Sequence, residues 1–173
     1  MTQPRHFIPW AYQLKIINHI LRHKMCAVWA GMGMGKTSSA LTAIDLLYLS
    51  GDLTGPVLVI APLRVARTTW PNEAKKWVHL RDMVVQPILG NERERIAALQ
   101  NKEATVFTIN YENIPWLVKY FDDGRAWPFT MLIPDESTRL KSFRGGLRRS
   151  KTGKVYLQAG GGMRSRALAR VVA

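Results

Sequence analysis

The sequence predicts an α/β domain in which a mostly parallel sheet is flanked by helices. Short apolar runs alternate along the chain with segments of helical periodicity, which is typical of β-α-β units. One apolar run leads into a glycine-rich loop that opens a helix, and another leads into a pair of carboxylates. A chain of 173 residues, 47% of them apolar, is long enough to bury one core.

The expected elements follow from hydrophobic spacing and from turn residues. Apolar residues at helical spacing predict helices, which we place at 10–24, 37–49, 71–77, 92–99 and 114–121. Short apolar runs predict buried strands, which we place at 25–30, 57–61, 83–88, 105–109 and 130–133. The only cysteine, Cys26, falls in the first of these strands, where a single cysteine is usually a small buried hydrophobic residue.

Charge divides the chain into a nearly neutral body and a basic end. The net charge is +13, and the residues after Glu136 hold ten Lys and Arg but no Asp or Glu. This balance favours a polyanionic partner such as nucleic acid, with solvated surface charge as the alternative. Residues 144–162 are glycine-rich and basic and predict a loop or an insertion, and 163–173 begin a helical pattern that stops. We therefore expect a domain over 1–143, a Gly-rich basic loop or insertion over 144–162 and the start of a truncated helix over 163–173.

Composition also limits the cellular compartment and the kinds of metal site that we expect. No apolar run approaches the roughly 20 residues that span a bilayer, and the first residues contain no apolar signal region. We expect an intracellular protein of the cytoplasm, or of the host cytoplasm if it is viral, with no membrane partner. A single cysteine and four dispersed histidines do not suggest a zinc site.

A glycine-rich stretch from Ala30 to Thr37 predicts a phosphate-binding loop. Glycines let backbone N–H groups approach a phosphate, and the following helix contributes the positive end of its dipole. Lys36 would neutralise the β and γ phosphates, and the Thr37 hydroxyl suits Mg²⁺. Ala30 stands where the strict pattern has glycine. The residues that we expect to contact the nucleotide here are Gly31, Met32, Gly33, Met34, Gly35, Lys36, Thr37 and Ser38.

Two adjacent carboxylates follow the last apolar run. Asp135 would share the Mg²⁺ with Thr37, and Glu136 would orient and activate water, so that Lys36 and Glu136 form the catalytic pair. Pro134 lacks an N–H for a strand ladder, and we expect it either to disturb the strand or to be tolerated at the strand's end.

These motifs together resemble the first RecA-like domain of superfamily-two helicases, nearest to the Swi/Snf-type translocases and especially their phage-encoded relatives. The resemblance covers nearly all of residues 7–143. Its segments in chain order are the adenine-recognition segment 7–13, motif I at 31–37, motif Ia at 59–65 with Trp70, Glu73 and Trp77 after it, the block 108–112 and motif II at 135–138.

The resemblance implies the ATP-binding half of an ATP-dependent nucleic acid helicase or translocase. Gln13 would read the adenine edge, and a second RecA-like domain, in cis or in trans, would complete ATP hydrolysis with Mg²⁺. The sequence stops before motif III, so the isolated chain is expected to be poorly active. DNA is favoured over RNA as the track. The expected nucleic-acid contacts are Arg64, Arg67, Arg139 and Lys141, with Thr108, Asn110 and Tyr111 as weaker candidates.

Two other functions remain open at this point. One is a non-enzymatic nucleic-acid-binding remnant of such a helicase, which Pro134 and the missing motifs favour. The other is a small P-loop kinase, which would leave the motif Ia block unexplained. The six tryptophans are expected to pack in the core rather than to stack on bases.

Overall fold

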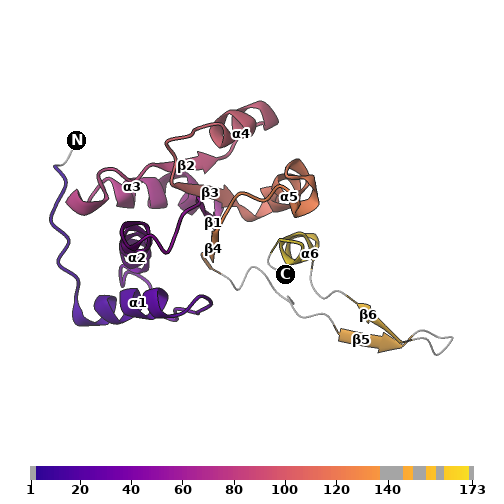
Figure 1. Ribbon diagram of the computed structural model, residues 1–173, viewed down its shortest axis with the longest axis horizontal. Coiled ribbons are helices and arrows are strands. Elements are labelled where there is room, and N and C mark those ends of the chain that lie inside the picture. The colour runs from indigo at the N-terminus through magenta and orange to yellow at the C-terminus, as the bar shows by residue number, and fades with distance from the viewer. Residues whose placement is uncertain (1–2, 137–145, 150–154, 159–161, 172–173) are drawn as a thin grey trace.

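A four-stranded parallel sheet forms the centre of the molecule, with the strand order β2-β3-β1-β4 (Figure 1). The computed structural model describes residues 3–136, 146–149, 155–158 and 162–171. The four strands are β1 (Val57–Ala61), β2 (Val85–Ile88), β3 (Val106–Asn110) and β4 (Met131–Pro134). Because β1 pairs in parallel with both β3 and β4, the carboxyl ends of these three strands meet at one edge of the sheet.

Helices cover both faces of this sheet (Figure 1). The helices are α1 (Ala11–Arg22), α2 (Lys36–Ser50), α3 (Trp70–Ala74), α4 (Glu92–Leu99), α5 (Ile114–Tyr120) and α6 (Met163–Ala169). Four short helical turns connect them: η1 (Val65–Thr69), η2 (Val78–Leu80), η3 (Tyr111–Asn113) and η4 (Asp122–Gly124).

The alternation of side chains along β1 explains why both faces are covered. Val57, Val59 and Ala61 belong to the hydrophobic cluster that includes the buried residues of α2 and α3. Leu58 and Ile60 belong to the opposite cluster, which includes buried residues of α4, α5 and α6. Every residue of β1 is fully buried, as expected for a central strand of a parallel sheet.

The α/β architecture predicted from the sequence is confirmed, and most elements lie within a few residues of their expected places. The periodic segment 92–99 is α4, and a capping box between Asn91 and Glu94 begins it. Pro134 is the last residue of β4 and pairs with Ile60, so it is accommodated at the strand's end. The expected helix 71–77 is shorter, because α3 ends at Ala74.

The strand predicted at 25–30 is wrong. These residues have no regular secondary structure, and Met25 and Trp29 are 90% and 82% exposed. Cys26 is exposed as well, which corrects its expected burial. An apolar run becomes a strand only where a neighbouring strand satisfies its backbone groups, and no described strand pairs with this segment.

The basic segment expected to be a loop or an insertion contains two strands. β5 (Gly146–Arg149) and β6 (Val155–Gln158) form a separate antiparallel pair, with Gly146 opposite Gln158. The rest of 144–162 lies outside the described residues, apart from Gly162, the N-cap of α6. α6 packs against α5 through Ala167 and Leu168, and it ends at Ala169.

The N-terminal segment crosses from α1 to the stretch before η2 and is fastened there. Arg5 N–H donates to Lys76 O at 2.7 Å, and Val78 N–H donates to Arg5 O at 3.0 Å. The Phe7 ring lies 4.9 Å from the Trp77 ring and 5.4 Å from the His79 ring, measured between centroids. α1 itself packs directly against α2. Within the described residues, no helix is both long and apolar enough to cross a membrane.

Candidate functional site

The glycine-rich loop between α1 and α2 adopts a conformation that requires glycine. Gly33 and Gly35 have φ values of +74° and +64°, in the left-handed region that side chains disfavour. A Cβ at position 35 would also collide with Nε2 of Gln13, whereas a Cβ at position 33 would meet open space. Gly35 is the N-cap of α2, so the loop ends where the helix dipole begins.

Lys36 folds back onto the loop that precedes it. Its Nζ donates to the carbonyl oxygens of Ala30 and Gly31, at 2.8 Å each. Those two bonds hold an ammonium group beside the backbone of the loop. Ser38 and Ser39 are buried, and both hydroxyls donate to Gly35 O at 2.9 Å. A contact between Ser38 and a ligand would therefore come from its backbone rather than from its hydroxyl.

Gln13 connects α1 to this loop. Its side chain is buried, and Oε1 accepts a hydrogen bond of 2.9 Å from the backbone N–H of Trp10, which caps the start of α1. Its Nε2 lies against Gly35. The residue expected to read adenine thus lies directly against the glycine-rich loop, although its oxygen is committed to the helix cap.

The orientation of α2 places the loop at the carboxyl edge of the sheet. At the other end of α2, the Tyr48 hydroxyl lies 2.8 Å from Gly55 O and 3.0 Å from Thr105 O. Gly55 lies two residues before β1 and Thr105 directly precedes β3, so this end of α2 lies at the amino edge. Fifteen helical residues span about 22 Å, which carries Lys36 to the opposite edge.

Asp135 lies at the same carboxyl edge, directly after β4. Its backbone N–H donates to Ile60 O at 2.7 Å, and its carbonyl oxygen accepts a hydrogen bond from the Tyr111 hydroxyl. Its side-chain oxygen Oδ2 accepts a hydrogen bond of 3.0 Å from the Trp70 indole nitrogen Nε1. Contacts from β1, η3 and α3 therefore fix this residue.

Glu136 and Thr37 complete the set of predicted catalytic and metal residues. Glu136 is exposed and has a φ of +57°, which is unusual for a residue other than glycine, asparagine or aspartate. Thr37 is half-buried in the first turn of α2. Among the described residues, no three His, Cys, Asp or Glu side chains gather into a metal cluster. One carboxylate with one hydroxyl, together with phosphate oxygens, remains a suitable oxygen donor set for Mg²⁺.

The predicted nucleic-acid contacts divide into three groups. Arg64 and Arg67 are exposed in and beside η1, at the carboxyl end of β1. Thr108 and Tyr111 are fully buried and Asn110 is 7% exposed, and Thr108 Oγ1 donates to Ala66 O, so these side chains are not exposed for direct contact in this structure. Arg139 and Lys141 lie outside the described residues.

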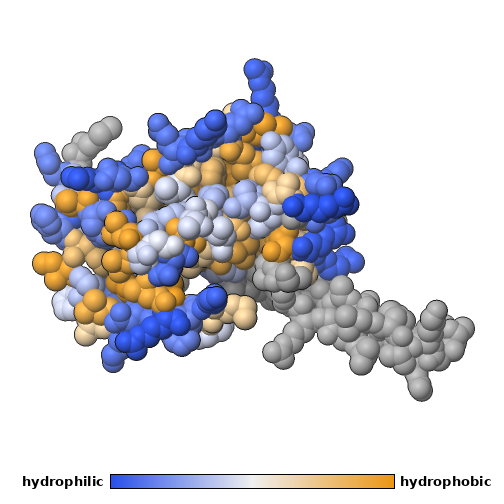
Figure 2. All heavy atoms as spheres, viewed as in Figure 1, coloured by the Kyte–Doolittle hydropathy of each residue, from blue (hydrophilic) through white to orange (hydrophobic). Residues whose placement is uncertain are grey.

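The expectation that the tryptophans pack in the core is met only in part. Trp70 is 2% exposed, whereas Trp10 and Trp29 are 70% and 82% exposed, so the expectation of packing is wrong for those two. Figure 2 shows apolar surface at the lower left, over the region of α1 and α2. Sequence reasoning also missed a recurring contact, in which an indole N–H donates to a carboxylate. The pairs are Trp70 with Asp135, Trp77 with Glu73 and Trp116 with Glu92.

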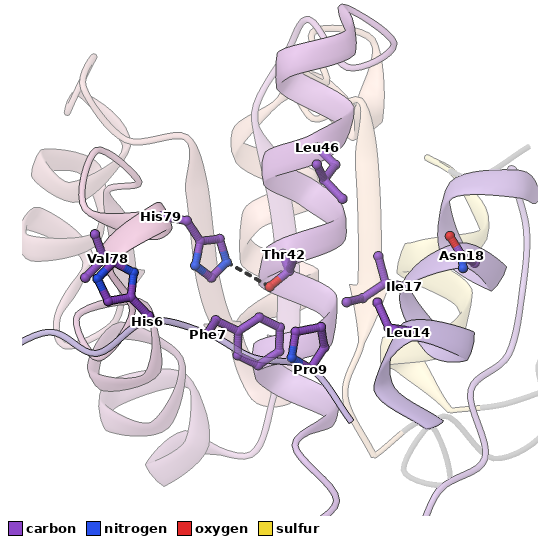
Figure 3. A pocket seen from close by; sticks show the side chains of 10 residues that line it. All are labelled: His6, Phe7, Pro9, Leu14, Ile17, Asn18, Thr42, Leu46, Val78 and His79. Carbon is purple, nitrogen blue, oxygen red and sulfur yellow. Dashed lines mark hydrogen bonds between the residues drawn. The ribbon is translucent and has the colours of Figure 1, made fainter. Parts of the chain in front are cut away.

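A pocket of about 410 Å³ opens between the N-terminal segment, α1 and α2 (Figure 3). Its wall is mostly apolar, and at one side the His79 imidazole lies 3.0 Å from the Thr42 hydroxyl. Burial lowers the pKa of His79, and the nearby Asp45 carboxylate partly offsets this effect. Burial raises the pKa of Asp45. Gln13 does not line this pocket, which is therefore distinct from the glycine-rich loop.

The chain is similar in sequence to several known proteins. The chain is 58% identical over 152 residues to protein p41 of Acyrthosiphon pisum secondary endosymbiont phage 1, covering 86% of this chain and 33% of p41. It is 29% identical over 150 residues to the chromatin remodeling factor mit1 of Schizosaccharomyces pombe, covering 79% of this chain and 10% of mit1. It is 28% identical over 117 residues to the transcription regulatory protein SNF2 of Saccharomyces cerevisiae, covering 67% of this chain and 7% of that protein.

The chain thus spans about a third of the length of the phage relative and a tenth or less of the two yeast proteins. The SNF2-related domain matches residues 12–152, from the start of α1 to beyond the carboxylate pair. Its match includes the glycine-rich loop, the motif Ia region and Asp135. With its all-parallel sheet flanked by helices, the chain belongs to the SNF2-related domain family and has the α/β RecA-like fold.

Proposed function

We propose that this chain is the nucleotide-binding half of an ATP-dependent nucleic-acid helicase or translocase. Residues 31–38 would surround the phosphates of ATP with backbone N–H groups, and Lys36 would move from the loop carbonyls to the β and γ phosphates. Gln13 would recognise the adenine edge from its place beside Gly35. Membership of the SNF2-related family supports the general class of this activity.

Mg²⁺ would lie between the phosphates, the Thr37 hydroxyl and the Asp135 carboxylate. When bound, the ion neutralises the charge that develops on the transferred phosphoryl group. Glu136 would orient the attacking water and accept its proton. A second RecA-like domain, in the same chain or another, would add the cations that complete the site. Such cations are worth about 10³–10⁵ in rate in phosphoryl-transfer enzymes.

One observation carries this proposal furthest. The loop that opens α2 and the carboxylate that follows β4 come from segments about a hundred residues apart, yet both lie at the carboxyl edge of one sheet. Ligands of open α/β sheets bind outside this edge. An exposed cationic side chain at Arg64 or Arg67 would bring a nucleic-acid backbone to the same edge.

The nucleic-acid partner is proposed to be DNA rather than RNA. Two of the relatives are named for chromatin remodeling and for transcription regulation, both of which involve DNA. The net charge of +13 supports a polyanionic partner. Contacts of this kind are independent of sequence, so binding should weaken steeply as salt concentration rises.

The test is to measure ATP binding and ATP turnover, each with and without Mg²⁺, single-stranded DNA, double-stranded DNA and RNA. We expect weak, magnesium-dependent ATP binding and slow hydrolysis by the chain alone. DNA binding without any nucleotide binding would favour the alternative function, a non-enzymatic nucleic-acid-binding remnant. Rapid, DNA-stimulated hydrolysis by the chain alone would contradict the need for a second domain.

A further inference from the structure

Trp70 is unusual among the tryptophans because it is buried and also donates to the predicted metal ligand. Its side chain is 2% exposed and packs in the hydrophobic cluster under α2. Its indole nitrogen Nε1 lies 3.0 Å from Asp135 Oδ2. An indole N–H can donate but cannot accept, so it always presents a positive edge to this carboxylate. The two residues are 65 positions apart in the sequence.

The backbone of Asp135 is fixed independently of Trp70. Its N–H is bonded to Ile60 O, and its C=O accepts from the Tyr111 hydroxyl. These bonds place the Cα but leave the side chain free to rotate about its own bonds. Among the described residues, the indole is the hydrogen-bond donor to the carboxylate, and it reaches Oδ2 but not Oδ1. Removal of this donor would therefore free the carboxylate without moving the strand.

Metal sites depend on such outer contacts. Mg²⁺ requires a nearly ideal octahedral arrangement of oxygen ligands, and groups that hold the ligands in place commonly change metal affinity by roughly 10–100-fold when they are removed. We propose that Trp70 is a positioning residue, whose indole N–H holds Oδ2 of Asp135 so that Oδ1 is presented to Mg²⁺. The inference rests on the proposed function of Asp135 as a magnesium ligand.

The same site explains why tryptophan rather than another large apolar residue stands at position 70. Phenylalanine would fill much of the same space but would leave Oδ2 without a donor. Trp70 is the first residue of α3 and is followed by Pro71, which restricts the backbone there, while the buried indole packs in the hydrophobic cluster. A rigid aromatic ring on a helix holds a carboxylate more firmly than a flexible lysine or arginine would.

The experiment compares Trp70→Phe with wild type by measuring the Mg²⁺ concentration needed for half-maximal ATP binding, and ATP binding in EDTA. Trp77→Phe is the matched control, because Trp77 donates to Glu73 at 3.1 Å from the neighbouring stretch. We expect Trp70→Phe to raise the Mg²⁺ requirement roughly tenfold or more. We expect the control to leave it unchanged and both variants to retain the affinity measured in EDTA. An unchanged Mg²⁺ requirement in folded Trp70→Phe would overturn the inference.

A second measurement does not depend on the stability of the variant. In the wild-type protein, the indole ¹H–¹⁵N resonance of Trp70 should shift when Mg²⁺ is added to the ATP-bound protein, and that of Trp77 should not. If the Trp70 resonance did not move while ATP binding still depended on Mg²⁺, the positioning role of Trp70 would be contradicted but the proposed function would stand. If wild type and all variants bound ATP equally with and without Mg²⁺, the proposed function itself would fail, so the two failures can be told apart.

Discussion

The two halves of the candidate site are held in very different ways. Asp135 is fixed through its N–H, its C=O and its carboxylate, by residues from three other parts of the domain. The glycine-rich loop on the other side follows a stretch, 25–30, that is irregular and largely exposed. The metal side is therefore organised by the core of this chain. On the phosphate side, regular secondary structure starts only at Lys36, the first residue of α2.

The strength of a sequence motif and the number of contacts that hold its residues in place are therefore separate properties. The glycine-rich loop is the strongest motif in the sequence, yet its preceding segment is among the most exposed parts of the described chain. The carboxylate pair is a weak motif by itself, yet Asp135 is held by long-range contacts. We therefore expect ligand binding and the packing of further chain segments to fix the glycine-rich loop more than they fix Asp135.

The largest expected difference is in the reactivity of Cys26, which lies in the exposed stretch. We expect a thiol reagent to label folded protein at a rate within about tenfold of the unfolded protein, because exposed segments open with almost no free energy. Labelling is measured by mass spectrometry over time. A rate thousands of times slower than that of the unfolded chain would show that the segment is buried in solution and would remove the contrast.

The next effect concerns the charge at the start of α2. Lys36→Ala should weaken ATP binding by about ten- to a hundredfold, because one charge-assisted bond contributes about 1.5–3 kcal/mol. The matched control is Lys24→Ala, which removes a charge from the exposed segment before the loop. Isothermal titration calorimetry measures both variants. Equal losses in the two would mean that bulk charge, rather than the loop, attracts the nucleotide.

Two glycines test how far the loop itself is organised. Gly35→Ala should destabilise the protein by about 2–4 kcal/mol, because its φ of +64° is strained for alanine and its Cβ would meet Gln13. Gly33→Ala has a similar φ of +74° but open space, so we expect only about 1–2 kcal/mol. Denaturant unfolding gives both values. A loss as large at position 33 as at position 35 would show that Gln13 exerts no constraint there.

The smallest expected effect is the pH dependence of stability that arises from His79, which lines the pocket. Because the pKa of His79 is lowered in the fold by burial, the unfolded chain takes up a proton first as the pH falls. The contribution of His79 to stability is therefore complete above its unfolded pKa and is lost as the pH falls below about 6.5. His79→Gln should reduce the fall in Tm between pH 7.5 and 5.5 by roughly 1 °C, since the group is mostly solvated. An identical fall in the variant would remove His79 as the cause.

Much of the fold could be predicted because its elements carry local signals. The capping box at Asn91 and the apolar run 57–61 are each a local signal for the element that forms there. The run 25–30 carries the same local signal as 57–61 but forms no strand, because strand formation depends on a neighbour. The pair β5 and β6 was missed because each strand is only four residues long and lies in a glycine-rich, basic segment.

The candidate site was predictable in its residues but not in its contacts. Motif spacing in the sequence identified Lys36, Thr37 and Asp135, because each has a defined chemistry and lies next to a predicted helix or strand. The bond from Trp70 to Asp135 joins positions 65 apart, and no local pattern announces it. The burial of Thr108 in β3 and of Tyr111 in η3 was equally hidden, because the sequence does not show the partner of a polar side chain.

The fastening of the N-terminal segment determines how much of that end can be removed. Gln3 and Pro4 are exposed and precede the first backbone bonds at Arg5, so deletion up to Pro4 should leave the fold intact. Deletion through Ile8 would take away both backbone bonds to 76–78 and the Phe7 ring beside Trp77. The face of Trp77 would then be open to water, and α1 would remain attached only by its own packing. Variants that begin at Arg5 should therefore stay soluble and folded, whereas variants that begin after Ile8 should aggregate.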